Sequence, residues 1–533
     1  MAYVIGFDFG NMNSFPCFIS DIDLNQGRMG GNVHDLLPAN KSCGIPSVFF
    51  YSNKVRMTAD TKPLPWCGDD AVRTAAKPLK NRKNLLKRHL GQKLVLDDRE
   101  FTYDEAIVQV IQYCIRSANK ILKEGWLEET NLISISYPAT YTSAQRERLV
   151  ELVEMATLED GRHLKVFGTI AEPAAAALDY LAEYAKSSKE TTVLTYDLGG
   201  GTFDLSLVTA YPEGRLNANG NRYYYDIINS RGIPNLGGHE FDERLFKLAK
   251  EKIGKKLTPG LNNEIYRQVE KAKIELTNNE ETVISYFDIE MGEFVDILIT
   301  REEFEKKTED LVQKTVEKTR EMLNDHRNQR PEVILLTGGA SQMPMIKKAI
   351  EAAFPEYKAA FPEDKDKIIY FRPSKAIAYG AARFGAVEEN ADPSDADEKE
   401  NSPIIQRTMY DLGVRIYHNV DDKEGYIDTL ISEGTEIPCL APEKKLYTLF
   451  ADQSKLCFEI YEAKNNHPDV NQIREDYTYI MEVTLDLKRK CKPGTPAVVC
   501  MGVNKKGILT FGAYDPENPS NKIDNTAELK NLS

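Results

Sequence analysis

Residues 4–14 read VIGFDFGNMNS, an apolar strand that carries one carboxylate, Asp8, immediately before a glycine and a polar turn. In an isolated strand, such an acid would be expected to lie in solvent at the edge of a sheet. Residues 193–203, VLTYDLGGGTF, superpose on this stretch without a gap, with Asp197 on Asp8 and Gly199 on Gly10. A repeat of this kind indicates two similar lobes, each of which offers one aspartate and one turn of backbone amides.

The two glycine turns suit phosphate oxygens, because no Cβ keeps a ligand away from the backbone N–H groups. Asp8 and Asp197 beside them are candidates to hold Mg²⁺, a hard cation that keeps several waters and needs only one or two carboxylates. Taken alone, the second turn is equally compatible with a structural hairpin. The candidate phosphate-binding residues are Gly10, Asn11, Met12 and Asn13 in the first turn and Gly199, Gly200, Gly201 and Thr202 in the second.

Length and composition argue against several classes of protein. The chain has 533 residues, too many for one hydrophobic core, so two to four domains are expected. A net charge of −14 disfavours a nucleic-acid partner. No apolar run approaches the roughly 20 residues that span a bilayer, so we expect no membrane insertion and a cytoplasmic location. The eight cysteines show no CxxC pattern and are expected to be reduced, and no His or Cys metal site is expected.

The pattern of apolar residues divides the chain into two domains and a joint. In residues 1–387, strand-like runs alternate with helix-like segments, which is typical of α/β architecture. Residues 388–403 are predominantly acidic and predict a solvated linker. Residues 404–520 show short runs with a period of two, which predicts a β-sandwich, and residues 521–533 predict a polar tail.

Two further segments fit a nucleotide cleft between lobes. Residues 333–344, VILLTGGASQMP, predict a strand, a Gly-Gly turn and a helix start, so Gly338 and Gly339 could approach adenosine or a phosphate. Glu172 precedes a proline at a predicted helix start, where an acid is equally expected as a favourable charge at the helix N-terminus.

Five blocks of sequence stand out between residue 3 and about residue 386. They are GFDFGNMNS, SISYPATYTSAQRERL, IAEPAAAALDY, YDLGGGTFDLSLV with LGGHEFDERL, and LLTGGASQMPMIKKAI with RPSKAIAYGAARFGA. Together they resemble the actin, sugar-kinase and heat-shock ATPase superfamily, and within it the seventy-kilodalton heat-shock chaperones of the DnaK type. The resemblance implies a two-lobed actin-like α/β ATPase domain, a duplicated ribonuclease-H-like fold, followed by an all-β sandwich.

The resemblance also implies roles for individual residues. Asp8 and Asp197 would organise Mg²⁺ through water, and Glu172 with Thr202 would complete the catalytic set. Pro138 and Arg146 would match the pair that senses the nucleotide. The implied ATP or ADP contacts outside the two turns are Gly237, Gly238, Glu270, Lys273, Thr277, Gly338, Gly339, Ser341 and Gln342.

The sequence departs from the family pattern at several of these positions. Asn11 and Met12 stand where hydroxyl residues are usual, and Ile274 and Gln342 stand where two arginines often sandwich the base. An ungapped match anchored on the Gly-Asp pair at residues 68–69 and the Lys-Arg pair at residues 87–88 places Val72 where a phosphate-facing lysine is expected. Because one donor at a phosphoryl site can contribute on the order of 3 kcal/mol, hydrolysis is expected to be slowed about a hundredfold or more.

These features predict a divergent ATP-dependent chaperone that binds unfolded or extended protein segments, with possible co-chaperones. The chain stops soon after the last predicted strand, so we expect no helical lid. The alternative is an adaptor that binds nucleotide, barely hydrolyses it and recognises one dedicated protein partner. A small-molecule kinase or filament-forming actin relative is a third class. It would show itself by a phosphorylated product or by ATP-dependent light scattering.

Overall fold

The computed structural model describes most of the chain, and it folds as two compact units. The first unit comprises Met1–Thr140, Met155–Tyr225 and Ser230–Ser402, and the second comprises Tyr141–Glu154, Asp226–Asn229 and Pro403–Ser533. The described residues are 3–20, 29–38, 41, 44–54, 64–74, 81–185, 189–217, 219–288, 291–357, 366–390, 402–464 and 468–526. Most of the predicted linker, 391–401, lies outside them, and residues 388–390 form the end of helix α9, Ala376–Asn390.

Two sheets of the first unit share one topology. In the first sheet, β1 (Ile5–Phe9) runs antiparallel to β2 and parallel to β10, which is in turn parallel to β11. In the second, β12 (Thr191–Leu198) runs antiparallel to β13 and parallel to β17, which is in turn parallel to β18. The internal repeat seen in the sequence is therefore also a repeat of strand order and direction. The remaining strands of the two sheets are β2 (Asn13–Ser20), β3 (Asn32–Asp35), β4 (Ile45–Pro46), β10 (Leu132–Tyr137), β11 (Lys165–Ala171), β13 (Phe203–Leu216), β14 (Arg222–Ile233), β17 (Val333–Thr337) and β18 (Ile368–Tyr370).

Helices α4 (Glu172–Tyr184) and α9 pack closely against each other and against strands of both sheets. Four consecutive alanines, residues 174–177, are fully buried on α4, and a Cβ on Gly380 of α9 would overlap the carbonyl of Ala175. Small side chains are thus what allow this close helix packing. The other helices of this unit are α1 (Gly68–Thr74), α2 (Tyr103–Glu124), α5 (Gly238–Ile253), α6 (Pro259–Asn278), α7 (Arg301–Asp325) and α8 (Pro344–Ala353), with 3-10 helices η3 (Leu86–His89), η4 (Gly339–Gln342) and η5 (Pro355–Tyr357).

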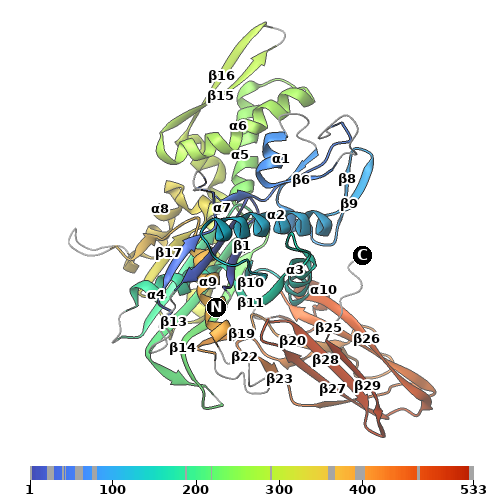
Figure 1. Ribbon diagram of the computed structural model, residues 1–533. Coiled ribbons are helices and arrows are strands. Elements are labelled where there is room, and N and C mark those ends of the chain that lie inside the picture. The colour runs from blue at the N-terminus through green and yellow to red at the C-terminus, as the bar shows by residue number, and fades with distance from the viewer. Residues whose placement is uncertain are drawn as a thin grey trace. The chain divides into compact units, whose positions relative to one another are not determined.

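Three small sheets complete the first unit. In Figure 1, the hairpin of β15 (Glu281–Asp288) and β16 (Glu293–Thr300) projects next to α6, against which β15 packs. The two other sheets are formed by β5 (Phe49–Phe50), β6 (Trp66–Cys67) and β7 (Arg82–Lys83), and by β8 (Lys93–Leu96) and β9 (Arg99–Thr102). Across the part of the chain that the structure describes, no helix is both long and apolar enough to cross a membrane.

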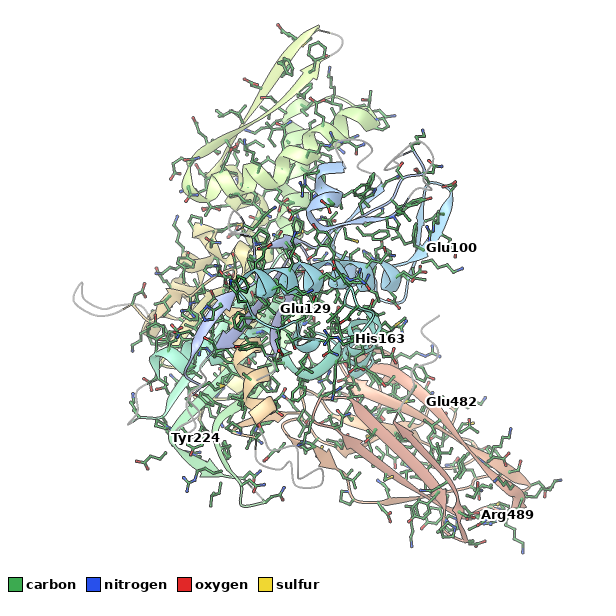
Figure 2. All side chains as sticks on the ribbon, in the orientation of Figure 1. Glu100, Glu129, His163, Tyr224, Glu482 and Arg489 are labelled. Carbon is green, nitrogen blue, oxygen red and sulfur yellow. The ribbon has the colours of Figure 1, made fainter. Side chains whose placement is uncertain are left out.

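The second unit is a sandwich of two antiparallel sheets, as the period-two pattern predicted (Figure 1). Its core contains Phe458 and Ile460 from one sheet and Met501 and Phe511 from the other. Alternate residues of the long strand β26 face solvent, such as Glu482, which Figure 2 labels. The sheets are β21 (Tyr426–Ile431), β20 (Leu412–Ile416), β25 (Gln453–Ala463) and β26 (Tyr477–Cys491), and β23 (Cys439–Leu440), β24 (Lys444–Tyr447), β27 (Pro496–Val503), β28 (Leu509–Asp515) and β29 (Asn518–Thr526).

The second unit also contains several short elements, and its last strand extends into the predicted polar tail. Strands β19 (Ile404–Arg407) and β22 (Glu436–Ile437) pair with each other, and the unit also holds the short helix α10 (Ile473–Asp476) and most of helix α3 (Ser143–Met155). The predicted polar tail begins too early, because residues 521–526 continue β29 and pair with β28. Backbone pairing at a sheet edge does not require apolar side chains, so composition alone missed this strand. Residues 527–533 lie outside the described part.

Seven cysteines lie among the described residues, and all seven are free thiols. Cys43, the eighth, falls outside those residues.

Candidate functional site

A cavity of about 400 Å³ in the first unit is lined by both aspartates and both glycine turns of the sequence repeat. This volume lies within the range of small-molecule sites. Two predicted contact residues, Gly237 and Ser341, do not line it. The predicted residues that do are Asp8, Gly10, Asn11, Met12, Asn13, Glu172, Asp197, Gly199, Gly200, Gly201, Thr202, Gly238, Glu270, Lys273, Thr277, Gly338, Gly339 and Gln342.

The acids of the site are deeply buried. Asp8 is 7% exposed and Asp197 is 2% exposed. Asp204, which sequence reasoning missed, lies directly opposite Asp197 in the β12–β13 register and is not itself a lining residue of the cavity. Burial and the charge of Glu172 raise the pKa of Asp8 to about 7, against the lowering effect of Lys87. Burial and Glu172 likewise raise the pKa of Asp204 to about 7, and burial raises that of Asp197. The sequence feature that could have identified Asp204 is its position two residues after Thr202, in the motif YDLGGGTFD.

These acids fit a hard cation. The Oδ1 atoms of Asp197 and Asp204 are buried without a hydrogen-bond partner, and an unpaired buried carboxylate oxygen is costly. A cation with its waters would satisfy both oxygens and offset the mutual repulsion of the acids. In the described residues, no three His, Cys, Asp or Glu side chains are grouped to hold a metal ion directly.

A buried lysine, Lys87, pairs with Glu172 of the cavity lining, although Lys87 is not itself a lining residue. The ungapped match, which put residue 72 at the lysine position, did not identify it. The ammonium of Lys87 is ion-paired with the carboxylate of Glu172, and both side chains are buried. Val72 lies on α1, is 36% exposed and does not line the cavity. Counting without gaps assigned the lysine to α1, whereas the structure brings it in on η3. A valine at residue 72 therefore does not mean that the buried lysine is lost, because Lys87 pairs with Glu172.

The second glycine turn is held by its carbonyl groups. Gly199 and Gly200 accept hydrogen bonds from the backbone N–H groups at the start of α5, at 2.8 and 3.0 Å, and Gly201 accepts one from Arg88. Arg88 also forms a fork with Glu240, at 2.8 and 2.9 Å. Because the C=O and N–H of one peptide point in opposite directions, the N–H groups that follow these carbonyls are directed to the other side of the turn, as a phosphate cradle requires.

Gly237 and Ser341 contact the second glycine turn and the strand before it, outside the cavity lining. A Cβ on Gly237 would lie 2.6 Å from the backbone nitrogen of Gly201, so glycine is required for α5 to approach the turn. The hydroxyl of Ser341 accepts a hydrogen bond from the backbone of Leu198 at 3.1 Å. Both residues position the turn rather than face the cavity.

Asn11 and Met12, the two residues of the first turn that depart from the family pattern, both line the cavity. Asn11 is 9% exposed, and its amide group lies against Gly201, where a Cβ would collide with it. The side chain of Met12 lies against Gly200, with its Cγ 2.5 Å from where a Cβ would stand. The Oδ1 of Asn11 has no hydrogen-bond partner in the structure, so it remains able to accept one. Met12 offers only a thioether, which is a weak acceptor and no donor.

Helix α6 contributes the next part of the lining. The ammonium of Lys273 contacts Asp242 at 2.8 Å and the carbonyl of Gly238 at 2.9 Å. Burial raises the pKa of Asp242 to about 6, partly offset by Lys273. Glu270 and Thr277 line the cavity from the same helix. Sequence reasoning missed several lining residues: His239, Asp242, Asn278, Met343 and Ser374. Four of them lie inside the sequence blocks quoted for the resemblance, where roles were assigned to other residues only, and Asn278 lies outside those blocks.

The predicted sensor residues lie elsewhere. Pro138 follows β10 in the first unit and is buried. Arg146 is on α3 in the second unit, where it donates to the Ser143 hydroxyl at 2.8 Å and lies 3.6 Å from the Glu462 carboxylate. Their sensing role stays a prediction.

The chain is similar in sequence to proteins of a known family. A family model described as Hsp70 protein matches residues 75–531. The chaperone protein DnaK of Thermotoga petrophila is 27% identical over 478 residues, which cover 87% of this chain and 70% of that protein. DnaK of Thermotoga maritima has the same identity and coverage. DnaK of Thermosipho africanus is 27% identical over 480 residues with the same coverage.

The family model covers the second glycine turn, Glu172 and the β-sandwich, and begins after Asp8 and the first turn. It confirms the family resemblance found in the sequence motifs. The chain belongs to the Hsp70 family of chaperones, as a divergent member related to DnaK.

Proposed function

We propose that the chain binds Mg-ATP in the cavity of the first unit, hydrolyses it slowly and couples the bound nucleotide to capture of extended protein segments by the β-sandwich. The observation that carries this proposal is that both acid-and-turn repeats and Glu172, which is ion-paired with Lys87, line one cavity. The shared topology of the two sheets supports a two-lobed, actin-like arrangement of this unit, built by duplication.

Phosphoryl transfer to water needs positioning and charge neutralisation, without a covalent intermediate. Bound Mg²⁺, held through water by Asp8 and Asp197, would supply charge neutralisation at the phosphates. Glu172 would orient the attacking water, and Lys87, its ion-pair partner, would stabilise charge that develops on the transferred phosphoryl group. The amides and hydroxyl of the second turn, including Thr202, would hold phosphate oxygens.

Slow hydrolysis follows from the first turn. Met12 places a thioether against Gly200, where a hydroxyl donor would serve the phosphates. Loss of one such donor costs roughly 3 kcal/mol at a transition state, or about a hundredfold in rate. Retention of Lys87 argues against complete loss of activity. The same Met12 contact also favours the second candidate, an adaptor that binds nucleotide with little turnover and recognises one dedicated partner.

A single-turnover assay with radiolabelled ATP tests the proposal. Wild type is expected to release labelled phosphate slowly, and Asp197→Asn is expected to abolish release. Asp310→Asn, an exposed acid on α7, is the matched control and should behave as wild type. Absence of turnover in wild type, or unchanged turnover in Asp197→Asn, would refute the ATPase.

Stimulation by polypeptides separates the two candidates for the β-sandwich. A chaperone of broad range is expected to hydrolyse ATP faster with many unfolded chains, and with co-chaperones if it has them. A dedicated adaptor is expected to show no stimulation by unfolded chains and tight binding to a single protein.

A further inference from the structure

The cavity lining contains a second group of residues that differs in character from the acids and turns. It consists of Ile274 and Asn278 from α6, Gln342 and Met343 around the end of η4, and Ser374 just before α9. We refer to these five residues as the base-facing group. With the phosphates on the glycine turns and the ribose beside Glu270 and Lys273, we assign the base to this group, which lines the cavity together with Thr277, Pro373 and Ile377.

The base-facing group is open to solvent. The side chains of Asn278, Gln342 and Ser374 are all exposed, and Ile274 is 57% exposed. Met343 is the exception, at 3% exposed. Gln342 makes one long contact, 3.4 Å from its Nε2 to the carbonyl of Gly339, and so is not held in one orientation. None of the five residues carries a charge.

Strong discrimination between ligands requires buried polar groups that lose a hydrogen bond when the wrong ligand enters. The exposed amides and hydroxyl of the base-facing group can form hydrogen bonds with water instead. A base that offers them no partner therefore leaves no polar group without a hydrogen bond. An amide side chain also carries both donors and an acceptor, so it can turn to meet either an exocyclic amine or a carbonyl. Ile274 and Met343 offer apolar contact, which depends on ring area and hardly on ring substituents.

From these features, and building on the proposed nucleotide binding, we propose that the site accepts purine nucleotides with little discrimination between adenine and guanine. The affinity for the guanine nucleotide lies within about tenfold of that for the adenine nucleotide, because packing contributes equally and no buried polar group of the base-facing group selects the ring edge. The substrate class is therefore purine nucleoside triphosphates rather than ATP alone.

The test is equilibrium binding of ADP and GDP, each with Mg²⁺, to the full chain by isothermal titration calorimetry. The expected dissociation constants differ by less than tenfold. A preference of more than a hundredfold for ADP, with ADP binding intact, would overturn this inference and leave the proposed function standing. Failure of both nucleotides to bind would overturn the proposed function and the inference with it.

A variant tests the physical cause. Ile274→Arg places a guanidinium beside the base, where it can stack on either purine, and is expected to raise the affinity for ADP and for GDP by similar factors. Val283→Arg is the matched control: Val283 is a 47% exposed apolar residue on β15 outside the cavity, and its substitution should change neither affinity. A gain for ADP alone in Ile274→Arg would contradict the idea that the contact is independent of ring substituents.

Discussion

Lys87→Met is expected to destabilise the first unit strongly, because the substitution leaves Glu172 buried without its cation. The Lys87 side chain is 2% exposed and that of Glu172 is 9% exposed, and Lys87 also lowers the pKa values of Asp8 and Asp197. Breaking a buried pair by removing one partner costs roughly 3–5 kcal/mol. For a unit of about 380 residues, whose entropy of unfolding is about 0.8 kcal/mol/K, this corresponds to a fall in melting temperature of about 4–6 °C.

The assay is a double-mutant cycle by differential scanning calorimetry in nucleotide-free buffer with chelator. Lys87→Met with Glu172→Gln removes both charges, so the double variant is expected to be more stable than Lys87→Met alone, within about 1–2 kcal/mol of wild type. The exposed pair Arg244–Asp310, 2.7 Å apart, serves as the control cycle, with an expected coupling below about 1 kcal/mol. A double variant that loses the full sum of the two single losses would refute the ion-pair reasoning.

Three further substitutions test the rest of the structure. Gly237→Ala should displace the second turn and weaken ADP binding at least tenfold in calorimetry. The control Gly260→Ala, whose Cβ would have no neighbour closer than 4.0 Å, should leave ADP binding unchanged. Equal affinities of the two variants for ADP would contradict the packing role of Gly237. Phe458→Ala should lower the free energy of unfolding of the sandwich by about 3–5 kcal/mol in denaturant unfolding. Tyr479 is 53% exposed, so Tyr479→Ala should lower it by much less. Similar losses in the two variants would contradict the assignment of Phe458 to the core. Val72→Lys should leave single-turnover ATP hydrolysis unchanged, and a faster rate would mean that residue 72 reaches the phosphates.

Much of the candidate site could be predicted from the sequence because its parts are local. A strand that ends in an aspartate and a glycine turn is visible as a run of adjacent residues, and its repetition at Asp8 and Asp197 predicted that the two belong to one site. The period-two pattern after residue 404 likewise predicted the sandwich, since side chains alternate between the two faces of a strand.

The rest depended on contacts between segments that are distant in the chain. Lys87 could not be assigned by counting, because the path of the intervening chain decides which side chain reaches Glu172. Asp242 and Ser374 belong to quoted sequence blocks, but only the fold shows that they line the cavity, and strand β29 gains its place by backbone pairing with β28.

By itself, the sequence determined the two acid-and-turn devices, the α/β character of the first part and the β-sandwich of the second, because these are properties of neighbouring residues. Only the tertiary structure decided which cation serves the acids, which glycine supports a turn rather than faces the cavity, and how exposed the base-facing group is. The burial of a side chain and its contacts with distant residues depend on the path and packing of the chain, and the spacing of a motif determines neither.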